Sequence, residues 1–308
     1  MFRGRKFSLA PAGSYTLPEQ EIRMRRSSLP AAVFNVAVVR VATFRLALVC
    51  VALGLGGVSA AQPATPDRGF NPEVFRDWVQ MRVGSGTPVY WYAVGTVYSS
   101  PSGQPLMRME GIDAARLDTT LSTPVKAHQL SRKTFVYRDV QSNAILREWQ
   151  GKPLPPISYP YQYITYELRG SGVESWVEQG AGARVQRIGP GTDIMARRIG
   201  GTLAFSAPLF LDFPLRDGTR SQTFEHYDFF DQSAAKGLKH PYQISWLRFG
   251  DLPAGLGKGV MHMVSWRVDR FEDLPQSIRD YVQNEAALWR DPPRDMAEIR
   301  RLQQPAGP

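Results

Sequence analysis

A two-residue alternation of hydrophobic and polar side chains dominates the chain between residues 88 and 268. β-Branched and aromatic residues are concentrated in these segments, a combination typical of strands with one buried face. The clearest hairpin is predicted where two segments flank Arg169-Gly-Ser-Gly172. The alternation predicts strands at 88–98, 106–112, 133–138, 144–149, 161–168, 173–179, 208–213, 223–230, 242–249 and 260–268.

Helical spacing of hydrophobic residues is found on either side of this region. Before it, Asn71 is suited to cap a short helix, and Pro72 fits the first helical position. After it, a segment that opens at Pro275 repeats apolar residues at helical spacing, with Asp273 as a candidate cap. Asp291-Pro-Pro293 is expected to end that helix, because proline cannot continue one.

The order of these elements predicts the fold class. No helical crossover separates the predicted strands, so consecutive strands are expected to pair antiparallel. The glycine-rich stretches at 180 to 201 are expected to be long loops, and the charged stretch from Asp295 to Gln303 a peripheral helix or a frayed end. We therefore expect an all-β core, a barrel or a strongly curved sheet, with a short N-terminal helix and C-terminal helices, in one domain over residues 71–308.

The chain begins with a predicted export signal over residues 1–61. Arg40 and Arg45 precede an unbroken apolar run from Leu46 to Leu55, and small residues follow up to Ala61. This order is that of a cleaved secretory signal, with residues 62–70 as a linker and a periplasmic or extracellular destination. The apolar run is shorter than the roughly 20 residues that cross a membrane, so no stable span is expected after cleavage. A tether formed by an uncleaved N-terminal anchor is the alternative.

Two features leave the route of export open. The leader is about twice the usual length of roughly 15–30 residues, and translation from Met24 would give a more ordinary signal. The pair Arg25-Arg26 is compatible with the twin-arginine route as well as with the general secretory route.

Charge and composition exclude several classes of function. The chain has 308 residues and a formal net charge of +9, but residues 1–61 hold eight basic and two acidic side chains. The remainder keeps a surplus of only three positive charges, too few for a phosphate-binding stripe, so no nucleic-acid partner is expected. Cys50 is the single cysteine, which removes a disulfide framework and any cysteine-based zinc site. Without a nucleotide-binding motif or metal-ligand spacing, no cofactor and no metal are expected.

Several motifs, taken in order, resemble those of one protein family. They are Val89-Tyr-Trp-Tyr-Ala-Val-Gly-Thr-Val-Tyr98, Met109-Glu-Gly-Ile112, Phe135-Val-Tyr-Arg-Asp139 with Glu148-Trp149, Ile244-Ser-Trp-Leu-Arg248, and Phe271-Glu-Asp-Leu-Pro275 before Asp291-Pro-Pro293. Over most of residues 70 to 295 their order and spacing resemble an uncharacterised, mostly exported bacterial family, domain of unknown function 1838. The chain differs from the family pattern at Asp139-Val-Gln-Ser-Asn143 and at Asp251-Leu-Pro-Ala-Gly255. The resemblance implies export and no particular reaction.

The best candidate for chemistry is the pair His226 and Asp228. Strand alternation places both on one face, where the carboxylate can orient the imidazole as a general base. A structural pair on a half-buried strand is the alternative interpretation. If the pair is catalytic, the protein is an enzyme that needs no metal.

The aromatic residues favour a different function. Residues 62–308 hold all seven Trp together with eleven Tyr and eleven Phe. Such rings pack sheets, and they also line the mouths of barrels that enclose apolar ligands. The leading hypothesis is an exported protein that binds a small, largely apolar molecule in an aromatic-lined cavity; the alternatives are the enzyme and an envelope interaction module. The oligomeric state stays open, and the candidate ligand-binding residues are Tyr90, Tyr92, Tyr163, Trp246, Arg248 and His262.

Overall fold

Long strands joined by short turns make up most of the described chain. The computed structural model describes residues 69–181, 184–188, 193–214 and 220–304. The strands are β1 (Val89–Ser99), β2 (Pro105–Leu117), β3 (Lys126–Arg138), β4 (Ile145–Leu146), β5 (Glu148–Trp149), β6 (Lys152–Pro153), β7 (Ile157–Arg169), β8 (Gly172–Ala181), β9 (Arg184–Ile188), β10 (Met195–Ile199), β11 (Thr202–Pro214), β12 (Arg220–Asp231), β13 (Tyr242–Asp251) and β14 (Lys258–Val268). The helices are α1 (Pro72–Val83), α2 (Gln276–Glu285) and α3 (Met296–Gln303), with short 3-10 helices η1 (Pro253–Gly255), η2 (Phe271–Asp273) and η3 (Ala287–Arg290).

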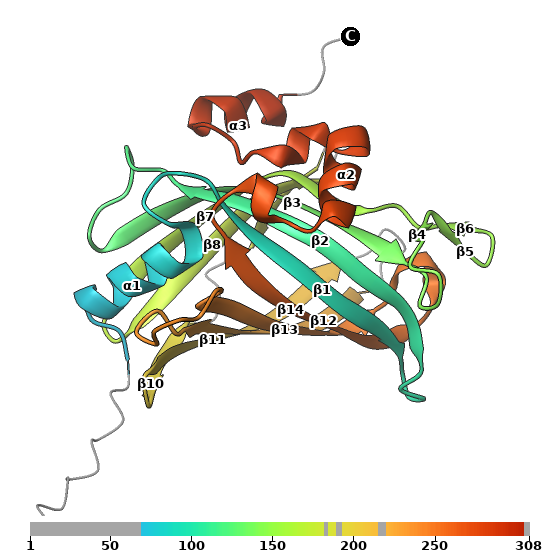
Figure 1. Ribbon diagram of the computed structural model, residues 1–308, viewed down its shortest axis with the longest axis horizontal. Coiled ribbons are helices and arrows are strands. Elements are labelled where there is room, and N and C mark those ends of the chain that lie inside the picture. Colours follow the sequence, from blue (N-terminus) through green and yellow to red (C-terminus); the bar gives the residue numbers. More distant parts are fainter. Residues whose placement is uncertain (1–68, 182–183, 189–192, 215–219, 305–308) are drawn as a thin grey trace, which may run out of the picture. The chain divides into compact units, whose positions relative to one another are not determined.

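The strands form one curled antiparallel sheet. Its order is β10-β11-β12-β13-β14-β1-β2-β3-β7-β8-β9, with β4 beside β3, while β5 and β6 form a separate hairpin. The two ends of the sheet approach each other, because Val173 on β8 forms a bridge to Ile194, next to β10. The sheet is therefore a nearly closed barrel (Figure 1), and the predicted fold class is confirmed.

Helix α1 fills one end of the barrel (Figure 1). Asn71 caps it as predicted, since its side-chain oxygen accepts a hydrogen bond from the backbone nitrogen of Val74 at 2.8 Å. Trp78 on α1 is buried and meets the rings of Phe205 and Phe229 edge-on, at centroid distances of 5.0 and 4.8 Å. These aromatic contacts tie the helix to the wall formed by β11 and β12.

Helices α2 and α3 cover the outside of the opposite wall, above β1, β2, β3 and β7 (Figure 1). On α2, Ile278 and Val282 are fully buried against outward-facing residues of β1 and β2, among them Tyr92 and Ile112. On α3, Ile299 packs into a smaller cluster with residues of β3 and β7. Figure 1 shows no described helix below β11 to β14, so the outer face of that wall stays uncovered by helices.

Three local expectations need correction. Asp273 ends η2 and does not cap α2, whose preceding residue Pro275 provides no side-chain cap. The helix ends at Glu285, before the predicted proline stop, because the chain turns there into η3. The stretch at 180 to 201 is not simply loop: β8 reaches into it, and β9 and β10 form there because each finds a neighbouring strand to pair with.

The predicted signal over residues 1–61 lies outside the described residues, as does most of the predicted linker. Among the helices that the structure describes, none has the length and apolarity needed to cross a membrane.

Candidate functional site

The barrel interior is apolar towards both ends and polar in between. Side chains alternate along each strand between the interior and the outer surface. Trp78 and its neighbours form the apolar cluster at the α1 end, and a second cluster around Val97 and Met261 lies further along the same strands. Trp246 packs against both clusters, so the polar groups that it contacts lie where the two meet.

The first polar group is a chain of ion pairs formed by Arg82, Asp113 and Lys133. Register pairs Asp113 on β2 with Lys133 on β3, and Arg82 reaches them from the last turn of α1. Arg82 Nη2 lies 2.7 Å from Asp113 Oδ2, and Lys133 Nζ lies 3.8 Å from the same oxygen. Arg82 and Asp113 are buried, and a buried carboxylate requires such cationic partners.

The second polar group, which we name the Glu225 site, consists of Glu225, Tyr227, Trp246 and Arg248. Two neighbouring strands provide it, since Glu225 pairs with Arg248 and Tyr227 pairs with Trp246 across β12 and β13. Glu225 Oε2 accepts hydrogen bonds from the Tyr227 hydroxyl at 2.7 Å and from Trp246 Nε1 at 3.2 Å. Arg248 Nη1 lies 3.8 Å from Glu225 Oε1, so charge attraction joins these two groups without a close hydrogen bond.

Solvent reaches this inward-facing region. The Lys133 and Arg248 side chains keep 20% and 30% of their exposed area although both point into the barrel. Tyr159, the cross-strand partner of Lys133 on β7, is also only half-buried. Exposed area on inward-facing side chains means that the interior is not completely filled at this level.

Electrostatics distinguish these groups from ordinary surface residues. Burial lowers the pKa of the Lys133 ammonium, although Asp113 pulls it in the opposite direction. Burial, followed by the nearby Glu225 carboxylate, raises the pKa of Tyr227 well above its usual value. Tyr227 therefore stays a neutral donor to Glu225 at neutral pH.

Of the predicted ligand-binding residues, Trp246 and Arg248 lie in the interior, and Tyr90 and Tyr92 lie elsewhere. The two tyrosines point outward from β1 and are buried beneath η2 and α2. The Tyr92 hydroxyl donates to Glu110 Oε1 at 2.7 Å. Their role in the structure is to anchor the covering helices, so they do not share a space with Trp246.

Tyr163 and His262 also lie outside the barrel interior. Tyr163 stacks on His128 on the outer face of β3 and β7, with a centroid distance of 5.4 Å. His262 is exposed on β14, where its Nε2 lies 3.4 Å from the Ser245 hydroxyl. Of the six predicted residues, only Trp246 and Arg248 thus share the barrel interior, and the other four lie on outward-facing strand positions.

The predicted catalytic pair is formed, on the outer face of the β11 to β14 wall. His226 Nε2 lies 3.1 Å from Asp228 Oδ1, and both side chains are about one-third exposed. The Ser206 hydroxyl donates to the same carboxylate oxygen at 2.6 Å, so the serine contacts the acid and not the imidazole. This order differs from that of a nucleophilic triad, in which histidine stands between serine and acid.

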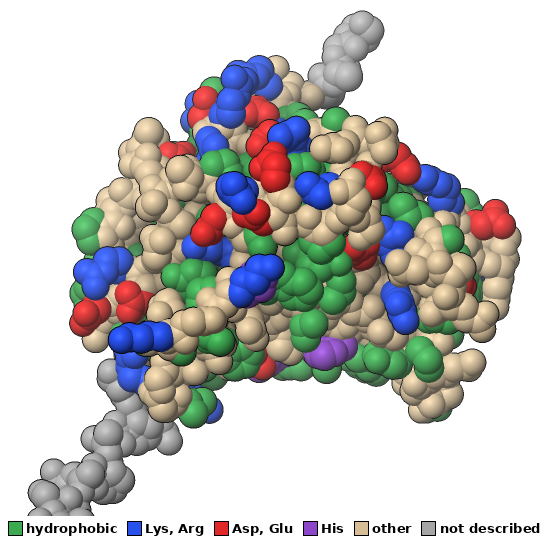
Figure 2. Space-filling model, in the orientation of Figure 1, with side chains coloured by type: hydrophobic (Ala, Val, Ile, Leu, Met, Phe, Trp, Pro, Cys, Tyr) green, Lys and Arg blue, Asp and Glu red, His purple; other side chains and the backbone are tan. Residues whose placement is uncertain are grey.

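This outer face is apolar around the pair. Hydrophobic and histidine side chains gather at the lower margin of Figure 2, which is where Figure 1 places this wall. The exposed hydrophobic residues of the face include Phe210, Leu247, Phe249 and Val264. A general base on such an open face lacks the enclosure that holds a substrate.

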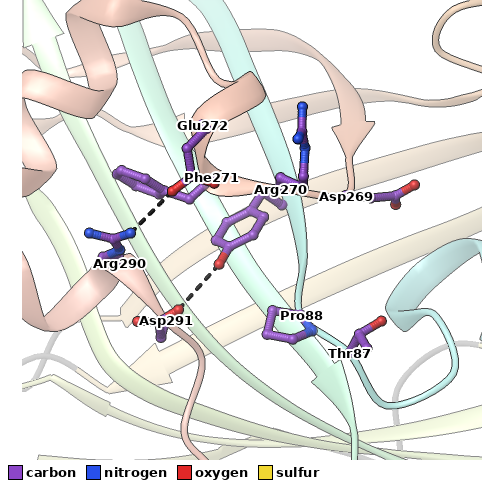
Figure 3. A pocket seen from close by; sticks show the side chains of 9 residues that line it. Thr87, Pro88, Asp269, Arg270, Phe271, Glu272, Arg290 and Asp291 are labelled. Carbon is purple, nitrogen blue, oxygen red and sulfur yellow. Dashed lines mark hydrogen bonds and ion pairs between the residues drawn. The ribbon is translucent and has the colours of Figure 1, made fainter.

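A surface pocket of about 270 Å³ opens beside η2 and η3 (Figure 3). Four of its polar residues are paired with one another, as the dashed lines in Figure 3 show: Tyr90 donates to Asp291 at 3.3 Å, and Arg290 lies 3.1 Å from Glu272. The Arg290 guanidinium also lies over the Phe271 ring. These contacts occupy the polar groups of Tyr90, Asp291, Arg290 and Glu272 within the pocket.

No group of three or more metal-ligating side chains comes together within the described ranges of the chain. Comparisons with models of known protein families, with curated proteins and with solved structures found no match.

Sequence reasoning missed most of the interior polar residues. Lys133, Asp113 and Arg82 come from three different elements, and no spacing along the chain connects them. For Glu225 a signal was available, because strand alternation puts this carboxylate, between Phe224 and His226, on the face opposite His226.

Proposed function

We propose that the protein binds a small, largely apolar molecule inside the barrel, against the Glu225 site. The observation that carries the proposal is the exposed area that remains on the inward-facing Lys133 and Arg248. A concave, mostly apolar space with a few converging polar groups is the usual form of a small-molecule site.

The surroundings of the Glu225 site suit such a ligand. Trp246 and Tyr227 present ring surfaces whose polar atoms are already bound to Glu225, which leaves their apolar faces for contact. The apolar cluster of Met261, Met263 and Tyr137 adjoins Trp246. Methionine side chains adapt to irregular shapes and favour apolar contacts.

Titration with N-phenyl-1-naphthylamine, an uncharged dye that brightens in apolar surroundings, tests this proposal. We expect saturable binding of one dye per chain. Trp246→Ala should weaken binding at least tenfold, which corresponds to about 1.4 kcal/mol. Leu247→Ala is the matched control, because Leu247 is the next residue but points outward, and its effect should stay within twofold.

A folded Trp246→Ala protein that binds the dye as well as the unaltered protein would contradict the proposal. If that variant unfolds, Trp246→Phe tests the same position with a smaller change, because it keeps one aromatic ring and removes the N–H donor together with part of the indole surface. Absence of dye binding to the unaltered protein would also reject the proposal.

We further propose that the protein is exported and that residues 1–61 are its signal. The apolar run after Arg45 and the small residues before Gln62 support this proposal. Protein recovered from periplasmic and medium fractions should have the intact mass of a chain that begins at Ala61 or Gln62. A full-length chain found only inside the cell would contradict it. Membership of domain of unknown function 1838 stays a prediction from the motifs.

A further inference from the structure

We propose that the natural ligand is an apolar acid, whose single negative charge is held between Lys133 and Arg248. This inference rests on the proposed function and names the chemical class of the molecule that the barrel takes. Four observations on the interior side chains carry it.

The first observation is that solvent reaches the two interior cations more than the two carboxylates. Lys133 and Arg248 keep 20% and 30% of their side-chain exposure, whereas Asp113 and Glu225 keep 7% and 10%. A molecule that enters this space therefore meets an ammonium and a guanidinium, while the carboxylates lie behind them. This arrangement favours an anion over a cation.

The second observation is that both cations have unused hydrogen-bonding capacity. Lys133 Nζ is 3.8 Å from Asp113, and Arg248 Nη1 is 3.8 Å from Glu225, both beyond hydrogen-bond distance. Arg248 Nε is buried without a hydrogen-bond partner among the described residues. Because solvent does not reach this Nε, a ligand oxygen would be bound by the exposed part of the Arg248 side chain and by the Lys133 ammonium, where charge-assisted hydrogen bonds can form.

The third observation is the balance of charge. Among the described residues of the ion-pair chain and the Glu225 site, Arg82, Lys133 and Arg248 are cationic, and Asp113 and Glu225 are anionic. One positive charge is left without a counterpart. Burial is the first cause of the lowered pKa of Lys133 and the nearby Arg82 adds to it, whereas Asp113 and Glu225 both raise this pKa.

The fourth observation is the apolar surface beside the cations. Trp246 packs against the cluster that contains Met261, Met263 and Tyr137, on the side away from α1. Those three residues are buried, so a ligand with its anionic group at Arg248 would lay its apolar part on the partly buried side chains packed against them, Phe135, Ile157 and Trp246. Simple inorganic anions would leave that surface without contacts, so an acid with an apolar body fits better.

The test compares two dyes that share one skeleton. 8-Anilinonaphthalene-1-sulfonate carries an anionic sulfonate, and N-phenyl-1-naphthylamine lacks it. On the unaltered protein we expect the sulfonate dye to bind at least tenfold more tightly. Equal or weaker binding of the sulfonate dye overturns the inference but leaves the proposed function standing, whereas no binding of either dye rejects both.

Charge-removing variants locate the contact. Arg248→Met and Lys133→Met should each lower the affinity for the sulfonate dye at least tenfold. Each should change the affinity for the uncharged dye less than twofold. Lys258→Met, at an exposed lysine on β14, is the matched control and should leave the affinity for both dyes unchanged. If Arg248→Met fails to fold, Arg248→Lys tests the same position and should retain most of the preference for the sulfonate dye.

Phe249→Ser distinguishes the interior from the apolar outer face, since Phe249 is exposed there. We expect this variant to bind both dyes as the unaltered protein does. Loss of sulfonate-dye binding in Phe249→Ser, with binding retained in Arg248→Met, would place the anion outside the barrel and overturn the inference.

Discussion

Trp246 donates its indole N–H to Glu225 at 3.2 Å, and the carboxylate oxygen that accepts it also accepts the hydroxyl of Tyr227, the cross-strand partner of Trp246. Two rings on paired strands thus converge on one carboxylate. This contact fixes the ring positions on the inner face of β12 and β13, and it keeps the carboxylate hydrogen-bonded while it faces Arg248.

Loss of this carboxylate should destabilise the fold. Glu225→Ala leaves Arg248 without its counter-charge and two partly buried donors, Tyr227 and Trp246, without an acceptor, and we expect a loss of about 3 kcal/mol in the free energy of unfolding. Urea denaturation of the variant and of the unaltered protein measures this difference in the free energy of unfolding. Asp228→Asn is the control, since that carboxylate is exposed and its loss should cost at most about 1 kcal/mol. Equal losses in the two variants would show that Glu225 has no special structural role.

The contact of α1 with the barrel depends on Trp78. Trp78→Ala removes a buried ring that touches Phe205 and Phe229, and we expect it to cost roughly 3–5 kcal/mol. Leu288→Ala, at an exposed position in η3, should stay within about 0.5 kcal/mol. Chemical denaturation measures the free energy of unfolding of both variants. If Trp78→Ala lowers this free energy by less than about 1 kcal/mol, α1 is not tightly packed against the barrel.

Docking of α3 should depend on pH through Glu298. Burial raises the pKa of this carboxyl, but hydrogen bonds from the Arg294 backbone at 2.9 Å and from Arg132 at 2.5 Å outweigh it, and the net pKa is lowered to about 2. A lowered pKa contributes stability above the pKa of the unfolded chain, near 4.3, and loses it as pH falls towards 2.

Glu298→Gln should therefore be less stable than the unaltered protein at pH 7 by roughly 1–3 kcal/mol, with a difference that shrinks below pH 4. Urea unfolding at pH 7 and pH 3 measures both differences. A gap that is independent of pH would contradict the assignment of the effect to this carboxylate.

The outer pair His226 and Asp228 should not take part in ligand binding. Its side chains lie on the face opposite Glu225, so His226→Ala should change the affinity for either naphthalene dye less than twofold. Dye titration of this variant beside Trp246→Ala compares the two faces of one sheet. A tenfold loss in His226→Ala would move the site to the outer surface.

The fold was predictable because local signals agreed with it. Alternation located the long strands, the cap at Asn71 located α1, and Gly170, at φ +57, occupies the tight turn between β7 and β8 as the pattern required. The strands within 180 to 201 were not predictable, because their pairing depends on neighbours that the local glycine-rich pattern does not reveal.

The site was less predictable because alternation separates two faces without saying which is inside. On β1 both faces carry buried residues: Trp91 faces the barrel interior, while Tyr90 and Tyr92 lie beneath covering helices. On β12 the aromatic residues Phe224 and Tyr227 also lie on opposite faces. Only the closure of the sheet and the position of α2 resolve these choices.

A crystal structure with 6-bromo-2-naphthoate bound, in which anomalous scattering locates the bromine, would show directly where an apolar acid binds. We expect a bromine peak inside the barrel beside Trp246, with the carboxylate near Arg248. A peak found only on the outer face beside Phe249, or an interior without ligand at saturating concentration, would contradict this expectation.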